Sequence, residues 1–250
     1  MTMTTNQSAE LTNQSILAHL NDLRIRVTWA AVSVLLGTIA SFFFARDILL
    51  FLLSPYDGEL QVLRPTEGIE TYFKVALLAG VILAMPFVLF QLWKFISPGL
   101  EKREKRYVYL FIPITMLLFL TGIVFAWLVL VPAAVTFLST FMPDIFVADW
   151  TGQEYIGFIL AMLFWLGLSF EMPVVAYFVA RIGVVQARAL GEQWRFAVVG
   201  ISVLAAAITP SIDPITMLLT MLPLVILYLI SIGTAYVGQR QFDNSMALDK

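Results

Sequence analysis

Glu171 is the residue whose chemistry is hardest to explain as ordinary packing. It lies inside a long apolar stretch, LGLSFEMPV at residues 166–174. A charged side chain at the centre of a membrane span costs roughly 2.5–3.5 kcal/mol or more, so such a group needs a proton, water or a partner. We therefore interpret Glu171 as a functional intramembrane group. The alternative is a structural role, in which the carboxyl group caps the backbone carbonyl freed by Pro173.

Two further carboxylates, Asp22 and Glu104, stand beside basic residues just before long apolar segments. Arg24 and Arg26 follow the first, and four cations surround the second within residues 102–106. One interpretation is local ion pairing on a solvated surface, where such pairs are weak. The other is recognition of a cationic partner, because a carboxylate accepts bidentate, charge-assisted hydrogen bonds from a guanidinium group.

The usual enzymatic signatures are absent from the sequence. There is no GxxxxGK[ST] phosphate loop, no HExxH zinc motif and no GxSxG nucleophile elbow. The chain has no cysteine, and its single histidine, His19, cannot form a metal cluster alone. We expect a protein that is not an enzyme and has no cofactor, no metal and no nucleic-acid partner.

The elements that position these residues are membrane-spanning helices. The chain is 60% hydrophobic and 13% charged, against roughly one half and one quarter in soluble domains. Long apolar runs predict helices, since backbone groups in lipid must pair internally. We expect an all-α, single membrane domain over 1–250, with a disordered tail at 1–15, a six-helix core at 16–237 and a cytosolic tail at 238–250. The six predicted segments are 27–44, 73–93, 107–131, 155–179, 196–208 and 215–237.

The distribution of cations gives the orientation. With the amino terminus inside, twelve of the fifteen Lys and Arg residues fall in cytoplasmic segments and only Arg46 and Arg64 fall in outer loops. Lys74 lies at the outer end of the second segment, where it can extend toward the interface. Both termini are therefore expected in the cytoplasm, which places Asp22 and Glu104 at the same membrane surface.

The predicted helices are irregular in length and shape. The fifth segment is too short for a normal bilayer core, at about 20 Å by helical rise. We expect the fifth and sixth helices to form a short hairpin turning at residues 209–214, a sequence with two prolines. Prolines inside other spans predict kinks and a concave bundle. A short interfacial helix is expected within the outer connection 46–72.

Four ordered motifs resemble the TatC family, the receptor subunit of the twin-arginine, Sec-independent protein translocase. They are HLNDLR at 19–24, FISPGL at 95–100 followed by EKR at 104–106, SFEMP at 169–173, and Thr209-Pro210 with Asp213. The resemblance runs from about His19 to Val237. It implies a structural role for Pro98, Gly99, Leu100, Pro173, Pro210 and Asp213.

The resemblance implies that the protein binds twin-arginine signal peptides of folded precursor proteins at its cytoplasmic face. The family usually has Glu where this chain has Asp22, which retracts the carboxylate by one methylene. A further implication is that single-span TatA/TatB-type subunits dock near Glu171. The receptor complex would be a homo-oligomer in the inner membrane of a prokaryote, and the proton-motive force would drive export. The implied signal-peptide site comprises Asp22, Glu104, Phe95, Leu20, Leu23 and Arg24.

Two other functions stay open from the residues alone. A proton-coupled secondary transporter for a small solute would use Glu171 as its proton relay, although no inverted repeat or paired helix interruption is visible. A non-transporting membrane scaffold is the third possibility. Binding of a twin-arginine peptide would separate the first function from the other two.

Overall fold

The computed structural model is a bundle of long helices. It describes residues 3–56, 58, 60–96, 105–142, 144, 150–209 and 214–248, with backbone alone for 3–19, 105–110 and 245–248. Within these residues the only β pairing is an isolated bridge between Gln61 and Thr151. The helices are α1 (Met3–Leu53), α2 (Glu67–Ile96), α3 (Lys105–Phe125), the π-helix η2 (Ala126–Leu130), α4 (Val131–Ser139), α5 (Gly152–Ser169), α6 (Met172–Arg181), α7 (Ala187–Glu192), α8 (Trp194–Ile208) and α9 (Pro214–Leu248).

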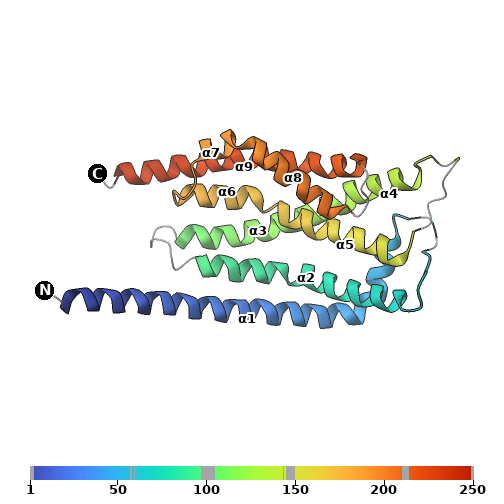
Figure 1. The fold of residues 1–250 in the computed structure, drawn as a ribbon, viewed down its shortest axis with the longest axis horizontal. Coiled ribbons are helices and arrows are strands. Elements are labelled where there is room, and N and C mark those ends of the chain that lie inside the picture. The colour runs from blue at the N-terminus through green and yellow to red at the C-terminus, as the bar shows by residue number, and fades with distance from the viewer. Residues whose placement is uncertain are drawn as a thin grey trace.

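Five helical stretches of the described chain are long and apolar enough to cross a membrane, and α8 is a shorter apolar helix. Its 15 residues rise only about 22 Å, so the predicted short fifth segment is confirmed. Both termini lie at the same end of the bundle, on the left in Figure 1. We call this end, which carries most of the basic segments, the inner end, and the opposite end the outer end.

The sixth helix is not short, and that prediction was wrong. Helix α9 has 35 residues and continues through Pro223 and past Val237. The polar residues after Val237 bond to neighbouring elements: the Tyr177 hydroxyl lies 2.7 Å from Oε1 of Gln241, and the Ala187 N–H donates to Gln239 at 2.8 Å. Tertiary contacts therefore extend the helix beyond its apolar segment.

Two other segments differ from expectation. Helix α1 includes residues 3–15, for which the sequence predicts a disordered tail. The outer connection between α1 and α2 contains turns and the bridge at Gln61, and its described residues form no separate helix. The prediction of an interfacial helix was therefore wrong for this part of the chain. Helix α1 continues to Leu53 and already includes the apolar residues on which that prediction rested.

Helices α1 and α2 pack antiparallel at a glycine contact. A Cβ added at Gly37 would lie 2.5 Å from the carbonyl oxygen of Gly80, so only glycine permits this approach. The contact fixes the register of the pair. Asp22 lies fifteen residues before Gly37 and Phe95 fifteen residues after Gly80, which brings Asp22 and Phe95 to the same level of the bundle.

Helix α5 forms the centre of the core. Its side chains pack on α2, α3 and η2, and the largest of them are almost fully buried: Tyr155, Ile156, Phe158, Ile159, Leu160, Met162 and Leu166. The third span continues past Pro132 as α3, η2 and α4 to Ser139. The fourth span is interrupted between α5 and α6, at Phe170 and Glu171.

Candidate functional site

The inner part of α1 presents the first motif to its surroundings. Leu20 and Leu23 are 53% and 38% exposed, and Arg24 is also exposed. Asp22 is half-buried and accepts a hydrogen bond from Nε of Arg26 at 2.8 Å through its Oδ2 atom. The local ion pair expected as one alternative is thus present, so a cationic ligand would have to share or displace Arg26.

Phe95 lies in the last turn of α2 and is half-buried. The register set by Gly37 and Gly80 brings it to the level of Asp22. Helix α3 begins at Lys105, immediately after Glu104, and Figure 1 shows the inner end of α3 beside that of α2, which in turn lies beside α1. Glu104 itself lies outside the described residues, so its approach to Asp22 stays a prediction. The other motif positions outside them are Ser97, Pro98, Gly99, Leu100, Pro210 and Asp213.

Glu171 lies at the junction of α5 and α6 and is only 5% exposed. Its Oε1 atom is buried without a hydrogen-bond partner among the described residues. The side chain lines a cavity of about 450 Å³ between α6, α7 and α9, whose other walls are mostly apolar and include Val175, Leu190 and Tyr228. A buried carboxyl group without a partner is costly, so this cavity is a place where a polar group of a ligand or partner would be stabilised.

The backbone around Glu171 is held from two sides. Its N–H donates to the carbonyl of Leu168 at 3.1 Å, and its own carbonyl accepts from the N–H of Val175 at 3.0 Å. Pro173 opens α6, and its carbonyl accepts a hydrogen bond from the Thr234 hydroxyl of α9 at 2.7 Å. The described hydrogen bonds include none from the Glu171 carboxyl group to the backbone, as a capping role would require.

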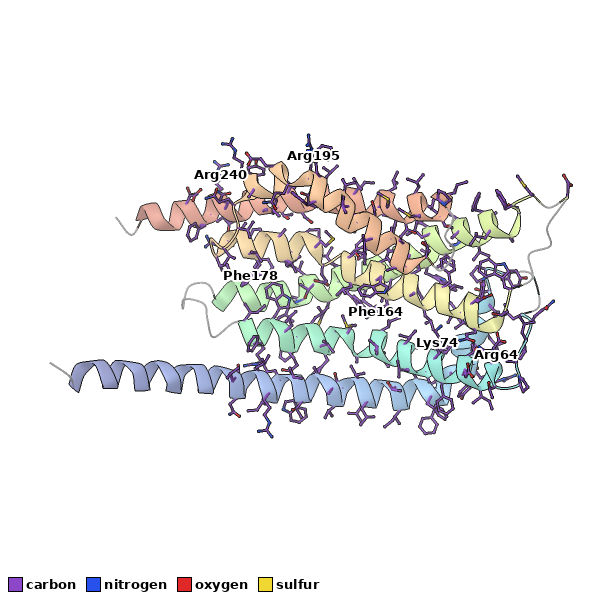
Figure 2. All side chains as sticks on the ribbon, in the orientation of Figure 1. Arg64, Lys74, Phe164, Phe178, Arg195 and Arg240 are labelled. Carbon is purple, nitrogen blue, oxygen red and sulfur yellow. The ribbon has the colours of Figure 1, made fainter. Side chains whose placement is uncertain are left out.

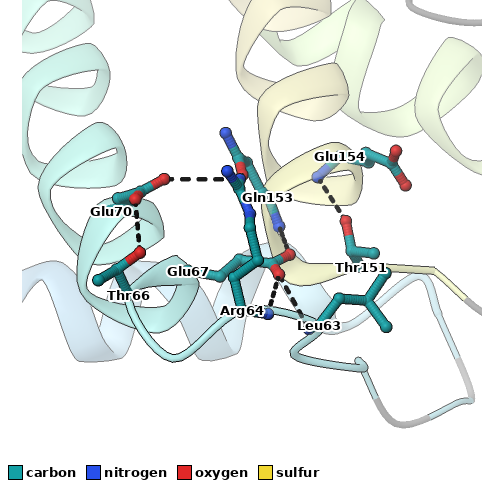
Figure 3. Close-up of polar contacts among 8 residues, drawn as sticks. All are labelled: Leu63, Arg64, Thr66, Glu67, Glu70, Thr151, Gln153 and Glu154. Atoms are coloured by element: carbon teal, nitrogen blue, oxygen red, sulfur yellow. Dashed lines mark hydrogen bonds and ion pairs between the residues drawn. The ribbon is translucent and has the colours of Figure 1, made fainter.

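The outer end carries a polar cluster that the sequence did not reveal (Figure 3). Glu67 is 2% exposed, and its carboxylate accepts from the backbone N–H groups of Leu63 at 2.9 Å, Arg64 at 3.3 Å and Gln153 at 3.4 Å. Arg64 also donates to the side chain of Gln153. One carboxylate thus joins the start of α2 to the start of α5, 86 residues away.

We expect Glu67→Ala to destabilise the protein by about 2 kcal/mol or more, because three backbone donors lose their acceptor at a cost of about 1–3 kcal/mol for each buried group. Thermal unfolding of the purified protein in detergent measures the effect. Glu70→Ala is the matched control, since that exposed carboxylate makes a 3.7 Å ion pair with Arg64 worth about 0–1 kcal/mol. Equal destabilisation by the two variants would contradict the role of Glu67.

Comparison with known proteins identifies the family of this chain. The family model described as Sec-independent protein translocase protein (TatC) matches residues 18–223. The TatC protein of Koribacter versatilis is 38% identical over 236 residues, with 91% of this chain and 87% of that protein covered. The TatC protein of Helicobacter pylori strain J99 is 34% identical, with 88% of each chain covered.

A solved structure of the same family has a similar fold. The crystal structure of a twin-arginine translocase receptor, TatC, superposes with a TM-score of 0.81 at 32% identity, covering 88% of this chain and 99% of that one. The family model spans the segments that carry Asp22, Phe95 and Glu171. The chain belongs to the TatC family of Sec-independent protein translocase proteins.

Proposed function

We propose that this protein is the receptor subunit of a twin-arginine translocase in the cytoplasmic membrane of a prokaryote. It binds the twin-arginine signal peptides of folded precursor proteins at the inner face and supports their export together with single-span TatA/TatB-type subunits. The family membership and the similarity to a solved twin-arginine translocase receptor support this function.

The observation that carries the proposal is that Asp22, in the inner part of α1, lies at the level of Phe95 at the inner end of α2, with α3 starting directly after Glu104. Two carboxylates at this level would give an arginine pair two bidentate acceptors. Lysine presents a point charge with no planar fork, so the same acceptors would favour arginine. The exposed Leu20 and Leu23 would contact apolar residues that follow the arginine pair.

Glu171 would act in a later step, inside the membrane. Its cavity between α6, α7 and α9 has mostly apolar walls and one carboxyl oxygen without a hydrogen-bond partner among the described residues, which suits an apolar partner helix carrying a polar residue. The energy for export would come from the membrane, where one charge moving through 100 mV is worth about 2.3 kcal/mol. Glu171 would either take up protons or bind the partner's polar group, and a homo-oligomer of receptor subunits would place several such cavities in one complex.

Photocrosslinking of a signal peptide tests the proposal. A photoreactive residue at Phe95 or Leu20 should capture a twin-arginine peptide and should capture the twin-lysine peptide far less. A photoreactive residue at Val62, which is 60% exposed at the outer end, is the matched control and should capture neither peptide. Equal capture of both peptides from Phe95, or capture only from Val62, would contradict the proposed receptor site.

A further inference from the structure

A second cavity lies at the outer end, far along the bundle from Asp22 and separate from the cavity of Glu171. Its volume is about 620 Å³, and α2, α5 and α8 contribute its walls. Charged and polar groups from the outer connections line one part, including Arg64, Gln153 and Glu154. Apolar residues of α5 and α8 line the other, including Phe158, Ala161 and Ile208.

Lys74 is a half-buried cation in this cavity whose charge no described contact balances. It is half-buried, it faces α5 so closely that a Cβ at Gly157 would collide with its Nζ atom, and no ion pair or hydrogen bond joins it to another described residue. Figure 2 shows it on the outer part of α2, close to Arg64. An ammonium group without a counterion is expensive at membrane depth.

Lys74 lies near the outer end of α2, one of the helices long and apolar enough to cross a membrane. It lies seven residues after Glu67, the first residue of α2, so it is about 10 Å from the outer end of a helix about 45 Å long. The short helix α8 ends at Ile208, in the wall of the same cavity. A short span is expected to thin the bilayer locally, which would bring the phosphate layer closer to Lys74 on this side of the bundle.

One face of α5 carries both a negative charge and an apolar surface. Glu154, Gly157, Phe158 and Ala161 are spaced as neighbours on one side of a helix, and all four line the cavity. Glu154 is exposed, and its carboxylate forms no ion pair with a described residue. Besides Arg64 and Glu67, whose charges have described partners, the cavity thus holds one cation, Lys74, and one anion, Glu154, next to an apolar surface.

We propose that this cavity binds one zwitterionic glycerophospholipid from the outer leaflet. Its phosphate contacts the ammonium group of Lys74, its primary amine contacts the carboxylate of Glu154, and one acyl chain lies along Phe158, Ala161 and Ile208. The lipid pairs at once with both charges that lack a partner among the described residues, which a purely anionic lipid or an apolar helix would not do. The inference does not depend on signal-peptide binding.

Photolabelling in vesicles tests the lipid site. The full chain is reconstituted in phosphatidylglycerol vesicles with a trace of phosphatidylethanolamine that carries a diazirine in its acyl chain, and label is located by peptide mapping. Label is expected on α5 and α8 near Ala161 and Ile208. Lys74→Gln should lower it about tenfold, the loss expected for one charge-assisted hydrogen bond, and Lys74→Arg should retain it. Lys94→Gln, which removes a lysine from the inner end of the same helix, should leave it unchanged.

Competition on the unmodified protein separates the sources of the phosphate group, and the variant Glu154→Gln tests the contact with the amine. Unlabelled phosphatidylethanolamine should displace the probe, and diacylglycerol, which lacks the phosphate, should not. Glu154→Gln should remove the preference for phosphatidylethanolamine over phosphatidylglycerol. Equal labelling in Lys74→Gln, displacement by diacylglycerol, or displacement by soluble glycerophosphoethanolamine alone would overturn the proposal. So would a photoreactive residue at Ala161 that captures a protein helix and no lipid.

Discussion

Replacing Asp22 or Glu104 with alanine is expected to weaken binding of a twin-arginine signal peptide about 10- to 100-fold, since each variant removes charge-assisted hydrogen bonds worth about 1.5–3 kcal/mol. Discrimination against the twin-lysine peptide should fall as well, because the planar guanidinium fork loses its acceptor. Fluorescence titration of the detergent-solubilised protein with labelled peptides measures both quantities. Asp47→Ala removes an exposed carboxylate from the outer part of α1 and should change neither.

The ion pair between Asp22 and Arg26 offers a sharper test. If Asp22 serves only to pair with Arg26 at 2.8 Å, then Arg26→Gln should reproduce the effect of Asp22→Ala. If Asp22 receives the peptide, Arg26→Gln frees the carboxylate and peptide affinity should hold or rise. Asp22→Glu restores the side chain usual in the family and should keep the affinity. Unchanged affinity and selectivity in both alanine variants would remove these residues from the receptor site.

The positions of the membrane spans were predictable because hydropathy measures the free energy of transferring each side chain between water and lipid. The short fifth segment, predicted at 196–208, is α8 at Trp194–Ile208, and the same reasoning located the buried Glu171. The sixth helix was predicted as short because its polar continuation carries no hydropathy signal. Gln239 and Gln241 extend it through bonds to Ala187 and Tyr177, and such long-range contacts leave no local pattern.

At the outer end, too, long-range contacts that leave no local sequence pattern could not be predicted. Glu67 follows Pro65-Thr66 and resembles any acidic residue in the first turn of a helix. Its burial results from the connection before α5, whose Gln153 N–H reaches it from 86 residues away. Lys74 was predicted to extend toward the interface, and the cavity that it lines exists because α5 packs against α2 and α8 packs against α5 there. No periodicity in one segment contains this information.

Replacing Glu171 with alanine is expected to abolish export while leaving signal-peptide affinity within about twofold, a free-energy change of about 0.4 kcal/mol. Glu171 lies at the junction of α5 and α6, well along the bundle from Asp22, so its loss should not disturb peptide binding. Export of a folded precursor and peptide titration of the same variant measure the two effects. Glu192→Ala removes an exposed carboxylate of α7 that pairs with Arg188 and serves as the matched control.

Glu171→Gln separates the two roles open to this carboxyl group. Glutamine keeps the size and the hydrogen-bonding capacity of the side chain but cannot exchange a proton. If Glu171 binds a polar group of a partner helix in the cavity beside Tyr228 and Ser231, Glu171→Gln should retain partner crosslinking and substantial export. If Glu171 takes up protons during transport, Glu171→Gln should fail in export as completely as Glu171→Ala while the partner still assembles. Normal export in Glu171→Ala would exclude both roles and leave the carboxyl group a structural one.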